Sequence, residues 1–441
     1  MKRPHLHAVV AATIFALPLH GQRAVAAIPA IDVIHYDARI EPDIPARTIR
    51  GIVTIRFAAR REAEGSVEFD SGDLTIDGVR ESGIPQGFSQ RDRHLRIQLN
   101  RAAGVDEARE VEVEYHGSPR SGILFFPDRS QVYTVFSTSQ WLVCIDDPED
   151  KSTLRLTVVL PAGLTAVGSG RLTAHEPAQN GHTRFEWRQE QPAPTYTFGF
   201  AAGNFTEMTD SHGHVRARYL ADGFSTAELG RLFRDTPDML DFFANRAGVP
   251  HPGAVYTQVL TVQGIGQEMS GFAVMPEAYG RAVLKDESAT GLGAHELAHQ
   301  WWGNQVTCRD WNHFWLNEGF ATFMSAAYVE HRDGRQAYLR AIDAARVRYV
   351  TVRDAGHDRP LVFPSWNRPT ADDRTIVYQK GAYALYRLRE TLGDRAFWAG
   401  IRQYTRTYFG KSVTSVDFQT AMEESSGRNL SKFFSEWVYL K

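Results

Sequence analysis

Short runs in which apolar and polar residues alternate fill the first half of the chain, from about residue 34 to residue 205. Clear examples are residues 53–57, 95–99, 111–115 and 154–158. Alternation with a period of two is typical of strands that are buried on one face. Gly, Pro, Asp and Asn residues separate the runs, and no helix-length segment lies between them. We therefore predict an all-β domain here, either a β-sandwich or a broad open sheet.

The pattern changes beyond residue 225, where apolar residues recur three and four positions apart. One series begins with Leu229, Leu232 and Phe233, and another contains Phe320, Phe323, Met324, Ala327 and Tyr328. This spacing predicts amphipathic helices. Short β segments are expected at residues 255–262 and 271–275. The predicted fold class is α+β in two domains, an all-β domain at residues 28–208 and a mostly helical domain at residues 209–441.

Residues 1–27 resemble neither half. Lys2 and Arg3 precede an apolar run at residues 8–19, and small residues follow at positions 24–27. These features are typical of a secretory signal peptide, and the apolar run is shorter than the roughly 20 residues that span a bilayer. We predict export to the periplasm or the medium, with no stable membrane insertion. The alternative is an N-terminal membrane anchor that is never cleaved.

Composition narrows the classes of partner. The 441 residues include 49 Lys+Arg and 52 Asp+Glu, the formal net charge is -3, and no block of like charge occurs. This balance argues against a nucleic-acid partner and against a polybasic membrane contact. Cys144 and Cys308 are the two cysteines. They lie far apart in the sequence, so we expect two separate buried thiols in a chain that is stabilised by burial.

Candidate chemistry is concentrated at residues 293–302. In a helix, His295 and His299 lie one turn apart on one face, where both imidazoles can reach one cation, and Glu296 lies beside them. Zinc binds imidazole nitrogen, and a catalytic zinc site uses three protein ligands and leaves a fourth position open. The pair therefore predicts one Zn2+ per chain and requires a third ligand.

Glu318 is the candidate third ligand. It follows His299 with 18 residues between them, and its apolar neighbours would pack its helix against the first. The alternative is an acidic residue in a first helical turn, where the helix dipole stabilises negative charge. A zinc ion would acidify a water molecule and polarise a carbonyl group, and Glu296, which is not a ligand, could accept the proton and pass it to a leaving amine. This set of residues indicates peptide hydrolysis.

With Gly319, Phe320 and Ala321 after the glutamate, these residues resemble the zinc aminopeptidases of peptidase family M1, the alanyl and leucyl aminopeptidases whose catalytic domain resembles thermolysin. Residues 34–37 look like the first strand of that family, residues 144–148 like its sandwich motif and residues 377–381 like its catalytic-tyrosine segment. The resemblance covers nearly all of the chain after residue 27. It implies an N-terminal β-sandwich or saddle, then a thermolysin-like, mostly helical peptidase domain.

The resemblance also implies two further roles. Tyr378 would donate a hydrogen bond to the oxyanion, a role that suits a neutral phenol. The family has a Gly-x-Met-Glu-Asn strand, whose glutamate binds the free α-amine of the substrate and whose backbone aligns the peptide. The corresponding positions here are Gly266, Gln267, Glu268 and Met269, with Gln267 in place of the methionine and Met269 in place of the asparagine.

Glu268 is therefore the candidate amine-binding residue. Its pairing with an ammonium group would explain removal of N-terminal residues only, because an internal peptide leaves the carboxylate unpaired. An exposed strand glutamate is the alternative. Typical members continue into a further domain that covers the cleft, whereas this sequence ends at Lys441. We therefore expect a more open site, or a cover provided by another subunit.

The predicted function is that of a zinc-dependent metalloaminopeptidase that acts on peptides. The alternatives are a zinc endopeptidase, an epoxide-opening member of the same family, or a catalytically silent binding module in which zinc is structural. The sequence leaves open both the preferred N-terminal residue and the oligomeric state.

Overall fold

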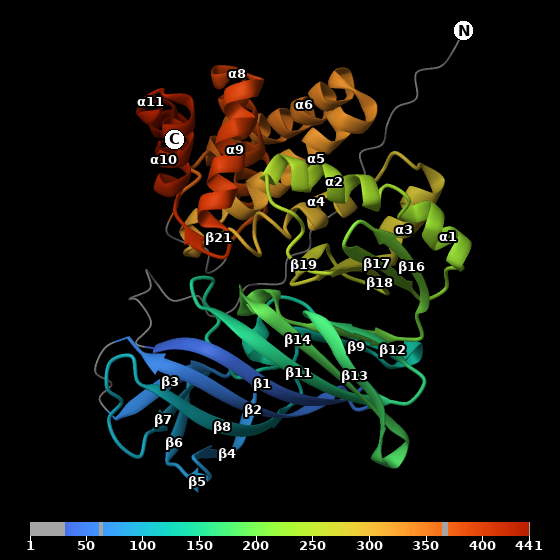
Figure 1. Cartoon of the computed structure of the whole chain (residues 1–441), viewed down its shortest axis with the longest axis vertical. Coiled ribbons are helices and arrows are strands. Elements are labelled where there is room, and N and C mark those ends of the chain that lie inside the picture. The colour runs from blue at the N-terminus through green and yellow to red at the C-terminus, as the bar shows by residue number, and fades with distance from the viewer. Residues whose placement is uncertain (1–30, 61–64, 364–368, 441) are drawn as a thin grey trace.

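The computed structural model describes residues 31–60, 65–363 and 369–440. The predicted signal peptide lies outside these residues. Figure 1 shows a β-rich domain below a domain that contains most of the helices. This arrangement confirms the predicted order of an all-β domain followed by a mostly helical one. Within the described ranges, no helix is long and apolar enough to cross a membrane.

The N-terminal domain is built around an eight-stranded sheet. Its strand order is β13-β14-β11-β1-β2-β8-β4-β5. Alternate positions along the strands are buried, and these positions form one large apolar core. The strands are β1 (Ile31–Asp43), β2 (Thr48–Ala59), β4 (Thr75–Glu81), β5 (Ile84–Pro85), β8 (Ala108–Gly117), β11 (Lys151–Pro161), β13 (Arg171–Ala178) and β14 (His182–Pro194).

Two smaller sheets accompany the large one. The first has the order β12-β15-β10-β9 and the second the order β3-β7-β6. Their strands are β3 (Ser66–Asp70), β6 (Phe88–Arg91), β7 (His94–Gln98), β9 (Ile123–Phe126), β10 (Gln131–Thr134), β12 (Thr165–Gly168) and β15 (Phe200–Gly203). A short 3-10 helix, η4 (Thr195–Thr197), connects β14 toward β15.

A five-stranded mixed sheet begins the C-terminal domain, with the order β16-β17-β18-β20-β19. Because β16 starts at Thr206 and pairs with β17, the predicted boundary between residues 208 and 209 falls inside this strand. Strand β19 lies at one edge and pairs with β20. The strands are β16 (Thr206–His212), β17 (Val215–Ala221), β18 (Val255–Thr261), β19 (Gln267–Met269) and β20 (Phe272–Pro276).

Helices cover this sheet and continue to the end of the described chain (Figure 1). They enclose a second large apolar core, which includes the face of α5 that the sequence predicted to be buried. The helices are α1 (Thr226–Leu232), α2 (Thr236–Ala247), α3 (Glu277–Lys285), α4 (Gly291–Ala298), α5 (Trp315–Asp333), α6 (Arg335–Val352), α7 (Ala371–Thr375), α8 (Gly381–Leu392), α9 (Asp394–Tyr408), α10 (Ser415–Ser426) and α11 (Ser431–Phe434). A short parallel pair, β21 (Thr307–Cys308) and β22 (Ser412–Val413), lies among them.

The two domains share a third apolar cluster. Tyr133 and Val135 contribute to it from the N-terminal domain, Val259 and Met269 from the five-stranded sheet, and Ile265 from the loop between β18 and β19. Cys144 and Cys308 lie in different domains, and both are buried and free. This finding confirms the expectation of two separate thiols.

Candidate active site

Helix α4 brings the two predicted histidine ligands together. His295 lies in its last turn, and His299 is the residue that ends it. The four-residue spacing puts both rings on one face, and their Nε2 atoms lie 3.0 Å apart. Ala294, Leu297 and Ala298 on the same helix are buried in the core, so the backbone that carries the imidazoles is fixed by packing.

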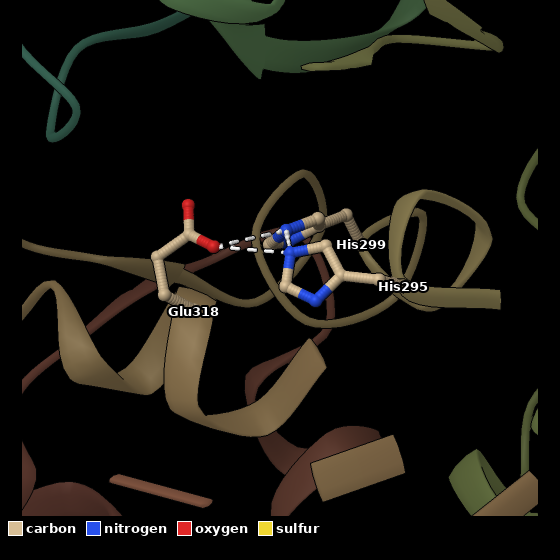
Figure 2. A group of neighbouring side chains, drawn as sticks. All are labelled: His295, His299 and Glu318. Carbon is tan, nitrogen blue, oxygen red and sulfur yellow. Dashed lines mark hydrogen bonds and ion pairs between the residues drawn. The ribbon is translucent and has the colours of Figure 1, made fainter. Parts of the chain in front are cut away.

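Glu318 completes the group from the first turn of α5. Its Oε2 atom lies 3.2 Å from Nε2 of His295 and 3.4 Å from Nε2 of His299. Figure 2 shows the carboxylate and both rings pointing toward one another. Tetrahedral zinc at about 2.0 to 2.1 Å from each ligand separates neighbouring ligand atoms by about 3.3 Å. The three observed separations fit a zinc ion without any change of side-chain position.

A hydrogen bond sets which nitrogen of His299 faces this centre. Its Nδ1 atom lies 2.9 Å from the carbonyl oxygen of Trp302, to which it can donate. In the neutral, metal-binding form of the ring, the proton lies on Nδ1 and the lone pair of Nε2 points toward Glu318 and His295. Metal-binding histidines are commonly oriented in this way by a hydrogen bond from the other ring nitrogen.

Three buried carboxylates surround the two imidazoles. Glu268, Glu296 and Glu318 are each 3% exposed. Burial raises the pKa of Glu268 to about 7 and holds that of Glu296 well above its usual range. Burial also opposes ionisation of Glu318, but the charge of His299 and hydrogen bonds from both rings lower its pKa to about 2. An excess of acidic groups in a buried site favours a bound cation.

Glu296 lies beside the ligands and is held against the backbone of Gly266. A Cβ atom at Gly266 would lie 2.0 Å from Oε1 of Glu296, so a side chain there would displace the carboxylate from its observed position. The Oε2 atom of Glu296 is buried and has no hydrogen-bond partner in the described part of the chain. A buried carboxylate oxygen without a partner is costly, and a water molecule or a substrate group would satisfy it. Glu296 therefore has an unpaired carboxylate oxygen close to the candidate metal ligands.

Tyr378 lies next to the metal ligands, in the π-helical turn η7 (Ile376–Lys380) between α7 and α8. Its ring stacks on that of His295, with 5.9 Å between the ring centroids and 9° between the planes. Burial raises the pKa of the phenol, and the neighbouring Glu318 carboxylate raises it further. The group is therefore a neutral hydrogen-bond donor close to the predicted reaction centre.

A pair of glycines sets the distance between Glu318 and Tyr378. Gly319 follows Glu318 on α5, and Gly381 begins α8 shortly after Tyr378. A Cβ atom added to either glycine would lie 2.9 Å from the Cα atom of the other. Two helix backbones therefore touch at this crossing, and a side chain there would force them apart.

We predict that Gly381→Ala lowers kcat about tenfold, because small displacements of a catalytic group are costly, with little change in KM. Overpacking should also cost roughly 1 to 3 kcal/mol of stability. Steady-state kinetics and thermal unfolding measure the two effects. Gly400→Ala is the matched control, because its Cβ atom would meet the Met422 side chain at 2.6 Å on helices that carry none of the site residues. Equal loss of kcat in both variants would contradict the prediction.

Strand β19 carries Glu268. A carboxylate oxygen of Glu268 lies within 4.8 Å of a carboxylate oxygen of Glu296 and a ring nitrogen of His299. The neighbouring residues point elsewhere. The Gln267 side chain accepts a hydrogen bond from the Phe136 backbone and donates one to the Tyr196 carbonyl, and Met269 is buried in the cluster shared by the domains. The side chains of Gln267 and Met269 are thus turned away from the substrate position, an orientation that the sequence did not predict.

Asn317 and Tyr196 are structural neighbours of the site that sequence reasoning missed. The Asn317 amide accepts a hydrogen bond from the Cys308 backbone and donates one to the Tyr196 hydroxyl. That hydroxyl donates in turn to the Gly303 carbonyl, in the loop that follows His299. The position of Asn317 next to Glu318 was the only signal in the sequence, and its partner lies 121 residues away.

Comparisons with known proteins find similar domains in the same order. The model of the peptidase M1 N-terminal domain matches residues 33–197, and that of the peptidase family M1 domain matches residues 271–437. Probable aminopeptidase 2 of Sulfurisphaera tokodaii is 27% identical over 92% of this chain and 53% of its own length. Leucine aminopeptidase 2 of Aspergillus fumigatus is 25% identical over 88% of this chain and 66% of its own length. The chain thus spans between half and two thirds of these relatives.

Solved structures similar to this chain have nearly the same extent. An M1 zinc metallopeptidase from Deinococcus radiodurans has a TM-score of 0.79 and 26% identity, and the match covers 97% of this chain and 95% of that one. A mutant of a two-domain M1 zinc metallopeptidase bound to L-tryptophan has a TM-score of 0.80 and 26% identity, with coverage of 97% and 96%. The arrangement of an N-terminal β domain and a helical peptidase domain is therefore found in other chains of this size.

Proposed function

This chain belongs to peptidase family M1, and we propose that it is a zinc-dependent aminopeptidase that removes single residues from the N-terminus of peptides. The observation that carries the proposal is the position of Glu268. This buried carboxylate lies beside His299 and Glu296. It is not one of the three side chains whose candidate ligand atoms lie closest together, which are His295, His299 and Glu318. It is available to pair with the ammonium group of a substrate whose first peptide bond lies at the metal centre.

His295, His299 and Glu318 would hold the zinc ion. When bound, zinc supplies Lewis-acid chemistry that acidifies water and polarises a peptide carbonyl. Glu296 accepts the proton of the attacking water and delivers it to the leaving amine, and its buried Oε2 atom, which has no partner in the described residues, can carry that proton. Tyr378 donates its hydroxyl proton to the oxyanion in a hydrogen bond. The residues of the chain thus cover proton transfer and charge stabilisation.

Strand β19 orients the substrate. It is an edge strand that pairs on one side with β20, so an extended peptide can align along its other side. Glu268 then binds the α-ammonium group, and the backbone at Gly266 approaches Glu296 closely because it has no side chain. A peptide blocked at its N-terminus would leave the buried Glu268 carboxylate without a partner.

We predict that acetylation of the N-terminus of a peptide lowers kcat/KM by roughly 30- to 5000-fold, because the loss of a buried charge pair costs about 2 to 5 kcal/mol. Matched free and acetylated peptides, assayed with and without a zinc chelator, test this. In Glu268→Gln the free peptide should lose most of its advantage. Efficient cleavage of the acetylated peptide by the wild type would instead indicate an endopeptidase.

We also propose that the protein is exported. The support is the positively charged start at Lys2 and Arg3, the apolar run at residues 8–19 and the small residues at 24–27. Peptides outside the cytoplasm would then be its substrates. A mature protein that begins near residue 28 is the expected result of N-terminal sequencing after expression in a secreting host, and recovery of the intact Met1 end from the cytoplasm would refute export.

A further inference from the structure

The buried side-chain amide of Gln267 attaches strand β19 to the N-terminal domain. Gln267 is 0% exposed. Its Oε1 atom accepts a hydrogen bond of 2.7 Å from the Phe136 backbone N–H, and its Nε2 atom donates one of 3.2 Å to the Tyr196 carbonyl. Both partners belong to the N-terminal domain. The side chain therefore connects the strand of the candidate amine-binding residue to the other domain.

The side-chain amides of Gln300 and Asn304, which follow His299 in the chain, hold the same strand. The carbonyl of Met269 accepts hydrogen bonds from Gln300 at 3.0 Å and from Asn304 at 3.1 Å. Gln300 also accepts one from the Gly271 backbone at 3.1 Å. Gln300 directly follows His299, so these bonds connect the strand to the end of the helix that carries the imidazoles.

Glu268 is the residue between these two attachments. Its strand has three residues and one strand neighbour, so the ladder alone restrains it weakly. Satisfied buried amides are directional and costly to break, and they therefore fix the register of the segment that they bind. The distance from the Glu268 carboxylate to the candidate metal ligands then depends on Gln267 and on the bonds from Gln300 and Asn304. A backbone bond of 2.8 Å from the Ser270 N–H to the Thr197 carbonyl also holds the end of the strand.

We infer that Gln267 is a positioning residue for Glu268, one that sets the site of the substrate ammonium group relative to the metal centre. This inference rests on the proposed aminopeptidase function. It concerns a feature of this chain, because Gln267 stands where the family signature has methionine, whose thioether cannot donate a hydrogen bond. A methionine there would pack in the same place without connecting the strand to Phe136 and Tyr196.

The test is a comparison of two ligands by calorimetry on the zinc-loaded full chain. L-tryptophan carries an ammonium group, and 3-(indol-3-yl)propionate is the same molecule without it. We expect the wild type to prefer L-tryptophan. Gln267→Met should reduce that preference roughly 10-fold or more, as expected for a misplaced partner group, and leave affinity for the propionate and the zinc stoichiometry unchanged. The ratio of the two affinities isolates the ammonium contact from general effects on the fold.

Gln131→Met is the matched control. Like Gln267, Gln131 is a buried glutamine whose side chain connects the two domains, but it belongs to the N-terminal domain. It accepts a hydrogen bond of 2.8 Å from the backbone of Val262, which lies outside β19. Its removal should leave the ligand preference unchanged. Glu268→Gln gives the limiting value, the preference that remains when the carboxylate charge is absent.

The outcomes separate this inference from the proposed function. A wild type with no preference for L-tryptophan would overturn the amine-binding role of Glu268 itself. A preference that is lost in Glu268→Gln but kept in Gln267→Met would overturn the positioning role alone. If Gln267→Met does not fold, Gln267→Asn replaces it, since this variant keeps a neutral amide but is one methylene too short to bond both Phe136 and Tyr196 in the present position of the strand. In this replacement variant, a reduction of the preference for L-tryptophan supports the inference, even if it is smaller than 10-fold. An unchanged preference overturns it.

Discussion

Glu296→Gln is expected to lower kcat by about 10²- to 10⁴-fold, the range by which a positioned general base accelerates a reaction. The glutamine keeps the shape of the side chain, which occupies the space beside Gly266. It cannot accept a proton from water. Because Glu296 is not one of the three closest ligands, the zinc stoichiometry should stay near one per chain.

Kinetics and metal analysis on the same preparation measure both quantities. Glu436→Gln is the control for the loss of one carboxylate, because this side chain is 56% exposed on the C-terminal segment. It should keep full activity. If Glu296→Gln turned over substrate at the wild-type rate with zinc bound, the assignment of the base would be wrong. A wild type that binds zinc but cleaves no peptide would support the silent binding module.

The parts of the site that could be predicted depend on local periodicity. His295 and His299 face the same way because four residues complete about one helical turn, whatever the rest of the chain does. The buried face of α5 was visible as apolar spacing, and it carries Glu318 toward α4. The resemblance to a family then supplied Tyr378 and Glu268, which spacing alone would have left among many tyrosines and glutamates.

The parts that could not be predicted depend on contacts between distant segments. Gln267 meets partners 71 and 131 residues away, so its orientation is not encoded in the pattern of its own strand. The π-helical turn that presents Tyr378 has no signature in hydrophobic spacing. The parallel pairing of β1 with β11 joins residues about 118 apart, such as His35 and Thr153, and no local rule selects it.

Glu318→Gln is expected to weaken zinc binding by about 100-fold or more. Structural zinc sites in small domains contribute about 10 to 16 kcal/mol over a full ligand set, so one ligand accounts for a few kcal/mol. The amide that replaces the carboxylate is neutral, and its oxygen is a weaker ligand for a dication. The two imidazoles lower the pKa of the Glu318 carboxyl group to about 2, so this group is negatively charged. The variant would lack that charge.

Competition with a chromophoric chelator measures the affinity, and thermal unfolding gives an independent readout. A ligand that binds only the folded state stabilises it, so zinc should raise the melting temperature of the wild type more than that of the variant. Glu268→Gln is the matched control, because this second buried glutamate lies beside His299 but outside the proposed ligand set. It should keep one tightly bound zinc ion.

Two groups of side chains in the described residues are close enough together to hold a metal ion. The variants Glu318→Gln and Glu268→Gln distinguish between them. One group is His295, His299 and Glu318, and the other is Glu268, Glu296 and His299. The first has all three ligand atoms 3.0 to 3.4 Å apart, the spacing expected around tetrahedral zinc. If Glu268→Gln lost zinc and Glu318→Gln kept it, the metal would occupy the second group. Glu296 would then be a ligand, and another residue would have to serve as the base.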